Sequence, residues 1–221
     1  NANEYAYYYG DVFVNSGTKG NGITLTFGDS VETVPDYMFE SGSEMLYPNI
    51  RNIVIGSNVR SIGNCAFRQC CSIESIDFGN SVETIGYSAF SDCINIREIN
   101  LPESVKFISD NAFLYCNGLT EITISESVEY LGHEAFGNCL SVDIVNYNAV
   151  NCETWYPFNY CENLRTVNIG NNVKNIPSYA FTYCRNLERV YIPDIAVQID
   201  KNAFIECGDF AIVCKNGSYA N

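Results

Sequence analysis

Residues 82–104 have the sequence VETIGYSAFSDCINIREINLPES, and the same 23-residue pattern recurs on both sides of them. Aligned copies are VRSIGNCAFRQCCSIESIDFGNS (59–81), VKFISDNAFLYCNGLTEITISES (105–127) and VEYLGHEAFGNCLSVDIVNYNAV (128–150). Two more copies, 173–195 and 196–218, follow a degenerate unit at 151–172, and a longer unit without the cysteine covers 31–58. Self-similarity at a fixed period of this length indicates a solenoid. The sequence therefore predicts about eight stacked coils.

The apolar residues of one unit are too few to form a core alone, so each coil must bury them against its neighbours. Segments such as SIESIDF, LTEITIS and INIREINLP alternate apolar and polar residues before a turn, which predicts a short strand in each coil and a parallel sheet along the stack. The segment around Ala-Phe is long enough for about one helical turn. We therefore expect an α/β, β-rich, right-handed solenoid with the sheet on its concave face and short helical or 3-10 turns on the other.

Seven of the eleven cysteines each follow a core phenylalanine by three residues, at Cys70, Cys93, Cys116, Cys139, Cys161, Cys184 and Cys207. A small, weakly polar side chain packs well at such a position. Translated copies point the same way rather than at one another, and the spacing lacks the short knuckle of a zinc site. We interpret these seven as a structural ladder. Four cysteines lie outside the ladder: Cys65, Cys71, Cys152 and Cys214. Whether two of them form a disulfide is left open.

The repeat V-x-x-I-G-x-x-A-F-x-x-C-x-x-L-x-x-I-x-L-P resembles the BspA-like, or treponemal-type, subclass of bacterial leucine-rich repeats. The resemblance covers about 31–218, and it departs from the family at the long first unit and at the irregular stretch 151–157. It implies a horseshoe-like solenoid on a cell surface or in a secreted protein, used for adhesion or recognition. It implies no particular ligand.

The composition excludes several classes of function. The chain has 26 acidic and 12 basic residues among 221, a net charge of -14, so we expect no nucleic-acid partner. No apolar run is long enough to span a membrane, and we expect no direct membrane insertion. The start, NANEY, lacks the features of a signal peptide, so we expect the targeting segment and anchor to lie outside this sequence. We predict one structural domain: an N-terminal β cap at 1–30, the solenoid at 31–218 and the start of a tail at 219–221.

Catalytic chemistry finds little support. His133 is the only histidine and occupies a turn position where other units have Asn64, Tyr87 or Asp110. A nucleophile–histidine pair would have to be built around this one residue. We expect no enzyme activity, no metal and no cofactor.

The strand face is the main candidate for binding, because residues that flank the inward isoleucine of each strand point outward. Solenoids commonly bind ligands on such a face. The candidate residues are Ser75, Asp77, Glu98, Asn100, Glu121, Thr123, Asn146, Thr166, Asn168, Arg189 and Tyr191. Trp155 and Tyr156 in the irregular coil are a second candidate contact, against the alternative that they only fill a distorted coil.

The sequence thus predicts a monomeric, non-catalytic module that recognises a protein or glycan, including one from a host, at a bacterial surface. A structural spacer that presents another domain of a longer surface protein is the alternative.

Overall fold

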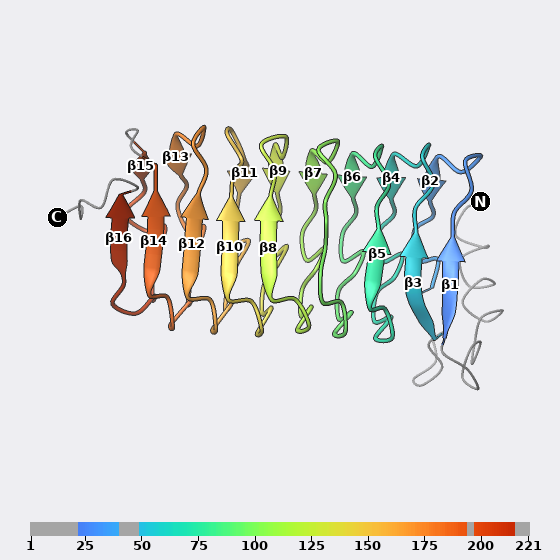
Figure 1. Ribbon diagram of the computed structural model, residues 1–221, viewed down its shortest axis with the longest axis horizontal. Helices are drawn as coiled ribbons and strands as arrows, with labels where there is room; N and C mark the ends of the chain where they lie inside the picture. Colours follow the sequence, from blue (N-terminus) through green and yellow to red (C-terminus); the bar gives the residue numbers. More distant parts are fainter. Residues whose placement is uncertain (1–21, 40–48, 194–196, 215–221) are drawn as a thin grey trace.

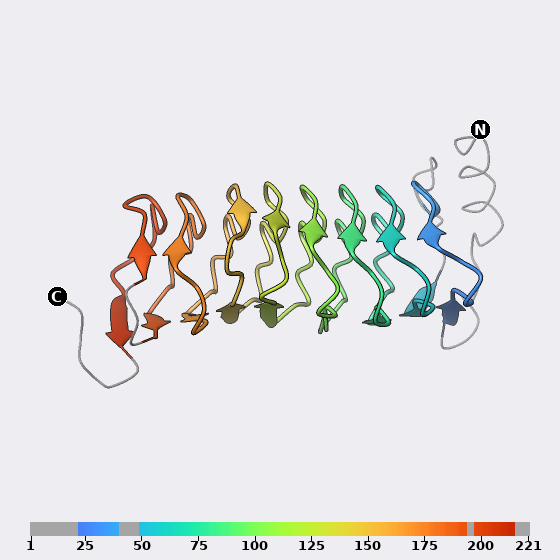
Figure 2. The same ribbon diagram turned by 90° about the horizontal axis from the view of Figure 1, so that it is seen from above.

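The computed structural model describes residues 22–39, 49–193 and 197–214, and the chain in these ranges forms a stack of β-coils (Figure 1). Most coils contain a long strand, a short strand that runs in another direction and a turn segment that returns the chain (Figure 2). In both views the coils follow a nearly straight axis, so the curvature expected of a horseshoe is slight.

The long strands form two parallel sheets along one side of the stack. The first sheet has the order β1-β3-β5 and the second β16-β14-β12-β10-β8. Their bounds are β1 (Ile23–Thr26), β3 (Ile50–Val54), β5 (Ser75–Asp77), β8 (Glu121–Ile124), β10 (Ile144–Tyr147), β12 (Thr166–Ile169), β14 (Arg189–Ile192) and β16 (Ala211–Cys214).

The short strands form a six-stranded sheet, β11-β9-β7-β6-β4-β2, and a separate pair, β13-β15. Each has two residues, and the apolar one usually points into the core. Their bounds are β2 (Thr33–Val34), β4 (Ser61–Ile62), β6 (Thr84–Ile85), β7 (Phe107–Ile108), β9 (Tyr130–Leu131), β11 (Glu153–Thr154), β13 (Asn175–Ile176) and β15 (Gln198–Ile199).

The repeat phase sets the register of these sheets. Ile122, Val145, Val167 and Val190 are consecutive partners across four coils, and all four are fully buried. Because every coil offers the same apolar position, a slip of one residue would turn these side chains out to solvent. The period of the sequence repeat therefore sets the register of the sheet.

The expected helical and 3-10 turns are wrong: the described residues contain no helix, and the class is all-β. In six of the described coils the returning segment holds two residues with positive φ, four apart, such as Cys65 (52°) and Gln69 (61°) or Asn111 (59°) and Tyr115 (59°). A right-handed helix cannot pass through a left-handed residue. Hydrogen bonds to the next coil replace helical ones, as in Phe67 N–H to the Ala89 carbonyl at 2.8 Å. No helix in the described ranges is long and apolar enough to cross a membrane.

Phenylalanine rings form the centre of the core. Phe67, Phe90, Phe113 and Phe136 are fully buried, and neighbouring rings are nearly parallel with centroids 5.0–5.3 Å apart. The column continues through Phe158 and Phe181 to Phe204. Each ring buries its faces between two others, so the core runs without a break through the stack.

The solenoid starts earlier in the chain than its predicted boundary at residue 31. β1 falls inside the stretch assigned to an N-terminal β cap, yet it pairs in parallel with β3, so the stack begins before residue 31. The remainder of that cap (1–21) and the tail at 219–221 lie outside the described residues.

The strand expected in INIREINLP does not form. Residues 97–100 have no strand geometry, and this coil separates the two long-strand sheets.

Candidate ligand-binding face

The long strands, and residues 97–100 of the coil between them that lacks a long strand, present outward side chains in two rows, which together we call the long-strand face. The first row includes Ser75, Glu98, Glu121, Thr166 and Arg189, and the second includes Asp77, Asn100, Thr123, Asn146, Asn168 and Tyr191. All eleven predicted binding residues are exposed or half-buried, and all lie on this face. Within a strand they alternate with buried residues such as Ile76 and Ile122.

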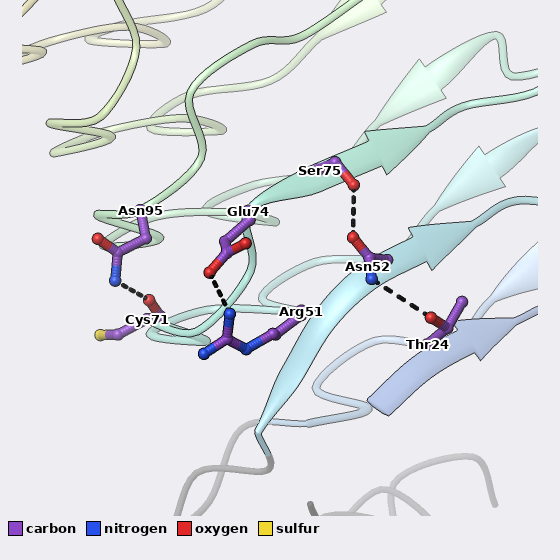
Figure 3. Close-up of polar contacts among 7 residues, drawn as sticks. All are labelled: Thr24, Arg51, Asn52, Cys71, Glu74, Ser75 and Asn95. Carbon is purple, nitrogen blue, oxygen red and sulfur yellow. Dashed lines mark hydrogen bonds and ion pairs between the residues drawn. The ribbon is translucent and has the colours of Figure 1, made fainter. Parts of the chain in front are cut away.

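Hydrogen bonds across the coils order the N-terminal part of this face (Figure 3). The Asn52 amide donates to Thr24 Oγ1 at 3.3 Å, and its Oδ1 accepts the Ser75 hydroxyl at 2.8 Å. Thr24 and Asn52 extend the row by two coils beyond the residues that sequence reasoning selected. The signal that could have found them is the alternation in ITLTF and in IRNIVI, which the long first unit shifts out of phase.

A second network orders the C-terminal part. The Asn146 amide donates to Thr123 Oγ1 at 3.0 Å and to Glu121 Oε1 at 2.6 Å. Its Oδ1 accepts from the Asn168 amide at 2.8 Å. These bonds join both rows over three strands, so the side chains are held before any ligand arrives.

The face is hollowed where the two sheets are interrupted. A cavity of about 430 Å³ lies there, and its lining residues are Ile99, Asn100, Leu101, Glu103, Thr123, Ser125, Glu126 and Asn148. The Asn100 amide donates a hydrogen bond at 2.8 Å to Glu98, which belongs to the same coil and not to a neighbouring one. The polar hollow thus lies among the predicted binding residues.

Charged residues alternate along one border of the face, a pattern that sequence reasoning missed. Arg51 pairs with Glu74 at 2.7 Å (Figure 3), and Arg165 lies 3.7 Å from both Asp143 and Glu188. These pairs are half exposed, so each contributes little stability. The sequence does contain a signal for these pairs, because residues of opposite charge occur one repeat apart. The Asn95 side-chain amide also links two coils, because it donates a hydrogen bond to the Cys71 carbonyl at 2.7 Å (Figure 3).

The seven ladder cysteines lie in the core, six of them fully buried and Cys207 partly buried. From Cys93 onward each thiol lies 3.1–3.5 Å from the carbonyl of the phenylalanine in the preceding coil, as its donor. The thiol is thus a hydrogen-bond donor as well as a filler, which the sequence did not reveal because its acceptor is 25 or 26 residues away. Burial raises the pKa of the Cys161 thiol to about 12. All eleven cysteines are free thiols, including Cys65, Cys71, Cys152 and Cys214.

The other candidate contact, Trp155 and Tyr156, lies in the turn segment after β11, away from the long strands (Figure 2). Trp155 is 59% exposed, and its ring centroid is 5.8 Å from that of Tyr156. His133 is half-buried; its ring meets Tyr156 edge-on at 5.8 Å, and its backbone N–H donates to Asp110 at 2.8 Å. These contacts make His133 part of the turn packing.

The geometry defines a parallel β-solenoid of about eight coils built from 23-residue repeats. The BspA type leucine rich repeat region matches residues 45–156 and 154–214, in six copies. The chain belongs to this leucine-rich-repeat family.

Solved structures of other leucine-rich repeat proteins resemble the chain. The leucine-rich repeat protein of Treponema pallidum is 25% identical with a TM-score of 0.62, over 85% of this chain and 79% of that one. A leucine-rich repeat protein from Bacteroides ovatus is 22% identical (TM-score 0.49), over 83% of this chain and 60% of that one. A leucine rich cell surface protein from Faecalibacterium prausnitzii is 22% identical (TM-score 0.47), over 87% and 69%. No curated protein matches the chain.

Proposed function

We propose that this chain is a non-catalytic recognition module of a bacterial cell-surface or secreted protein, and that it binds its partner through the long-strand face. The observation that carries the proposal is the pair of outward rows in which Asn52 and Asn146 tie side chains of neighbouring coils together. Side chains that are already ordered lose less conformational freedom on binding. Membership of a family associated with surface and secreted proteins supports the location.

The charge of the face favours one kind of partner. Asp77, Glu98 and Glu121 are exposed on it, against one cation, Arg189. With a net charge of -14, the protein attracts cationic surfaces over long range and repels anionic ones. A protein with a basic patch is therefore the favoured ligand, and a glycan that bonds the amides and Tyr191 is the alternative.

The test uses the whole chain on an array of matrix proteins and glycans. We expect the wild type to bind at least one basic matrix protein and Asp77→Lys/Glu98→Lys/Glu121→Lys to lose that binding. The matched control, Glu129→Lys/Glu153→Lys/Asp209→Lys, changes the net charge equally at exposed sites off the face and should bind as the wild type does. Circular dichroism checks that all three proteins fold.

Two outcomes would contradict the proposal. If the face variant binds as well as the wild type, the long-strand face is not the binding site. If both variants lose binding equally, the binding depends on net charge alone. Binding only to glycans would replace the favoured partner with the alternative. If nothing binds the wild type, the structural spacer becomes the better account.

A further inference from the structure

Five aromatic side chains gather on the turn side of the stack, which we call the aromatic patch: Trp155, Tyr156, Tyr160, Tyr179 and Tyr183. The Tyr156 and Tyr179 rings are stacked with centroids 4.6 Å apart, and those of Tyr160 and Tyr183 with centroids 4.5 Å apart. Trp155 is inclined to the first pair, with its centroid 6.3 Å from that of Tyr179. Desolvation raises the pKa of the Tyr156 phenol, and the phenols of Tyr179 and Tyr183 raise it further.

The solenoid core does not require this patch. Corresponding positions before the Ala-Phe segment are occupied by Asn64, Asp110 and His133 in other coils, which stack without a tryptophan there. The core phenylalanine of the same coil, Phe158, is fully buried, whereas Trp155 is 59% exposed. An exposed tryptophan beside ordered tyrosines is costly in water, and such clusters mark binding surfaces.

Two acids close to the patch in sequence have partners of their own. The carboxylate of Glu134 accepts a hydrogen bond from the Asn159 amide at 2.9 Å, and Glu162 lies 4.0 Å from Arg185. These nearby acids are engaged, and Lys201 follows in the next coil, one residue before the Asn202 carbonyl that accepts the Tyr179 N–H. Because the net charge of -14 attracts cations, a cation over the rings is a competing ligand, which the experiment below distinguishes from a sugar.

The chemistry suits a neutral sugar ring. In β-linked glucose or galactose, one face carries C–H groups with partial positive charge, which pack on the negative face of an aromatic ring. The hydroxyls at the sugar's edge can bond the phenol groups of the tyrosines, which both donate and accept. Anionic sugars are repelled by the net charge of -14.

We propose that the aromatic patch is a second binding site, separate from the long-strand face, for neutral β-linked hexose glycans. Trp155 and Tyr179 supply the stacking surface, Tyr156 stacks on Tyr179, and the Tyr160–Tyr183 pair borders the site. The site would let the protein hold a polysaccharide on one side and its partner on the other.

Trp155 is the only tryptophan of the chain, so its fluorescence reports on this site alone. We expect titration of the full chain with cellohexaose to change that fluorescence to saturation. Tyr179→Ala keeps the reporter and removes its neighbour, and should weaken binding by about three- to tenfold, the effect of one aromatic contact. Tyr87→Ala is the matched control, because Tyr87 is exposed but lies outside the patch.

Saturation-transfer NMR gives an independent readout, in which the ring C–H protons of the sugar should receive more saturation than the others. If Tyr179→Ala does not fold, Trp155→Leu followed by NMR replaces it. No response to cellohexaose, or the same affinity in the Tyr179 or Trp155 variant, would overturn the proposal. A response to tetramethylammonium or octaproline in place of the sugar would overturn it too. The face variant Asp77→Lys/Glu98→Lys/Glu121→Lys should retain the sugar response, which separates this site from the proposed function.

Discussion

The Sγ atom of Cys93 lies 3.1 Å from the carbonyl oxygen of Phe67 in the preceding coil. The same carbonyl accepts the backbone N–H of Cys70 at 3.1 Å. One buried carbonyl oxygen thus accepts hydrogen bonds from two neighbouring coils. This arrangement gives the repeated cysteine a role that neither alanine nor valine can perform, since neither has a side-chain donor.

We expect Cys116→Ala to lower the free energy of unfolding by about 1–3 kcal/mol, because it removes a buried donor to Phe90 and leaves a small cavity. Cys116→Ser keeps a donor and should lose less. Urea unfolding followed by circular dichroism measures the difference. Cys214→Ala, at a half-buried edge position, is the control. An alanine variant as stable as the wild type would show that the thiol contact contributes nothing.

Stability should fall at alkaline pH. Burial raises the pKa of the Cys161 thiol to about 12, from an ordinary value of 9.0. It also raises the pKa of Cys70, Cys93, Cys116 and Cys139. Between these values the unfolded chain loses protons that the folded chain keeps. The stabilisation is therefore complete below pH 9 and is lost as the pH approaches 12, by up to about 1.4 kcal/mol per pH unit for each thiol.

Urea midpoints between pH 8 and 11 test this dependence. Cys161→Ala should have a shallower slope than the wild type. A free energy of unfolding that stays constant above pH 9 would contradict the buried, protonated state of the ladder.

Cys207 should be the first ladder thiol to react. The neighbouring Cys184 thiol lowers the pKa of Cys207, and Cys207 is half-buried whereas the other six ladder cysteines are fully buried. Thiolate character and exposure together control alkylation. Brief treatment of the folded protein with iodoacetamide, followed by peptide mass spectrometry, should modify Cys207 before Cys184 or Cys161. The reverse order would be inconsistent with this structure.

Truncation within the phenylalanine column should be costly. Phe113 is fully buried between Phe90 and Phe136, so Phe113→Ala should destabilise the fold by about 3–5 kcal/mol. Phe107, only six residues away, is 41% exposed, and Phe107→Ala should change stability by less than about 1 kcal/mol. Thermal unfolding of the two variants compares a buried ring with an exposed one in the same coil. Similar losses in both would refute the assignment of the core.

Gly86 marks a close approach between coils. A Cβ at this position would lie 2.7 Å from the backbone of Gly63 and 2.8 Å from that of Asn64. Gly86→Ala should therefore destabilise by about 1–3 kcal/mol, as overpacking does. Gly28→Ala is the control, because a Cβ there meets nothing within 4 Å. The urea midpoint distinguishes the two, and a neutral Gly86→Ala would mean that the coils can move apart at no cost.

Much of this fold could be predicted from the repeat alone. The period places Val82, Ile85, Phe90 and Cys93 in the core, and the structure buries all four completely. The family resemblance is confirmed by the match over residues 45–156 and 154–214. The prediction succeeds because contacts in a solenoid join equivalent positions of neighbouring repeats, so one-dimensional spacing already contains the three-dimensional neighbours.

The helical turns were mispredicted for a physical reason. The left-handed residues that prevent a helix include Gln69, Asp92 and Tyr183, none of which is a glycine. Their conformation is imposed by hydrogen bonds to the next coil, such as Gln69 N–H to the Ser91 carbonyl at 2.8 Å. Local propensity could not indicate it.

By itself the sequence determined the coil count, the core positions and which side chains of the strands face outward, because these depend only on period and alternation. The tertiary structure decided what requires two or more coils in place: the thiol bonds to phenylalanine carbonyls, the amide networks of Asn52 and Asn146, and the hollow beside Asn100. It also decided that Trp155 lies exposed against Tyr156 and Tyr179. Spacing can align residues, but distances, hydrogen-bond geometry and exposure exist only once the coils have stacked.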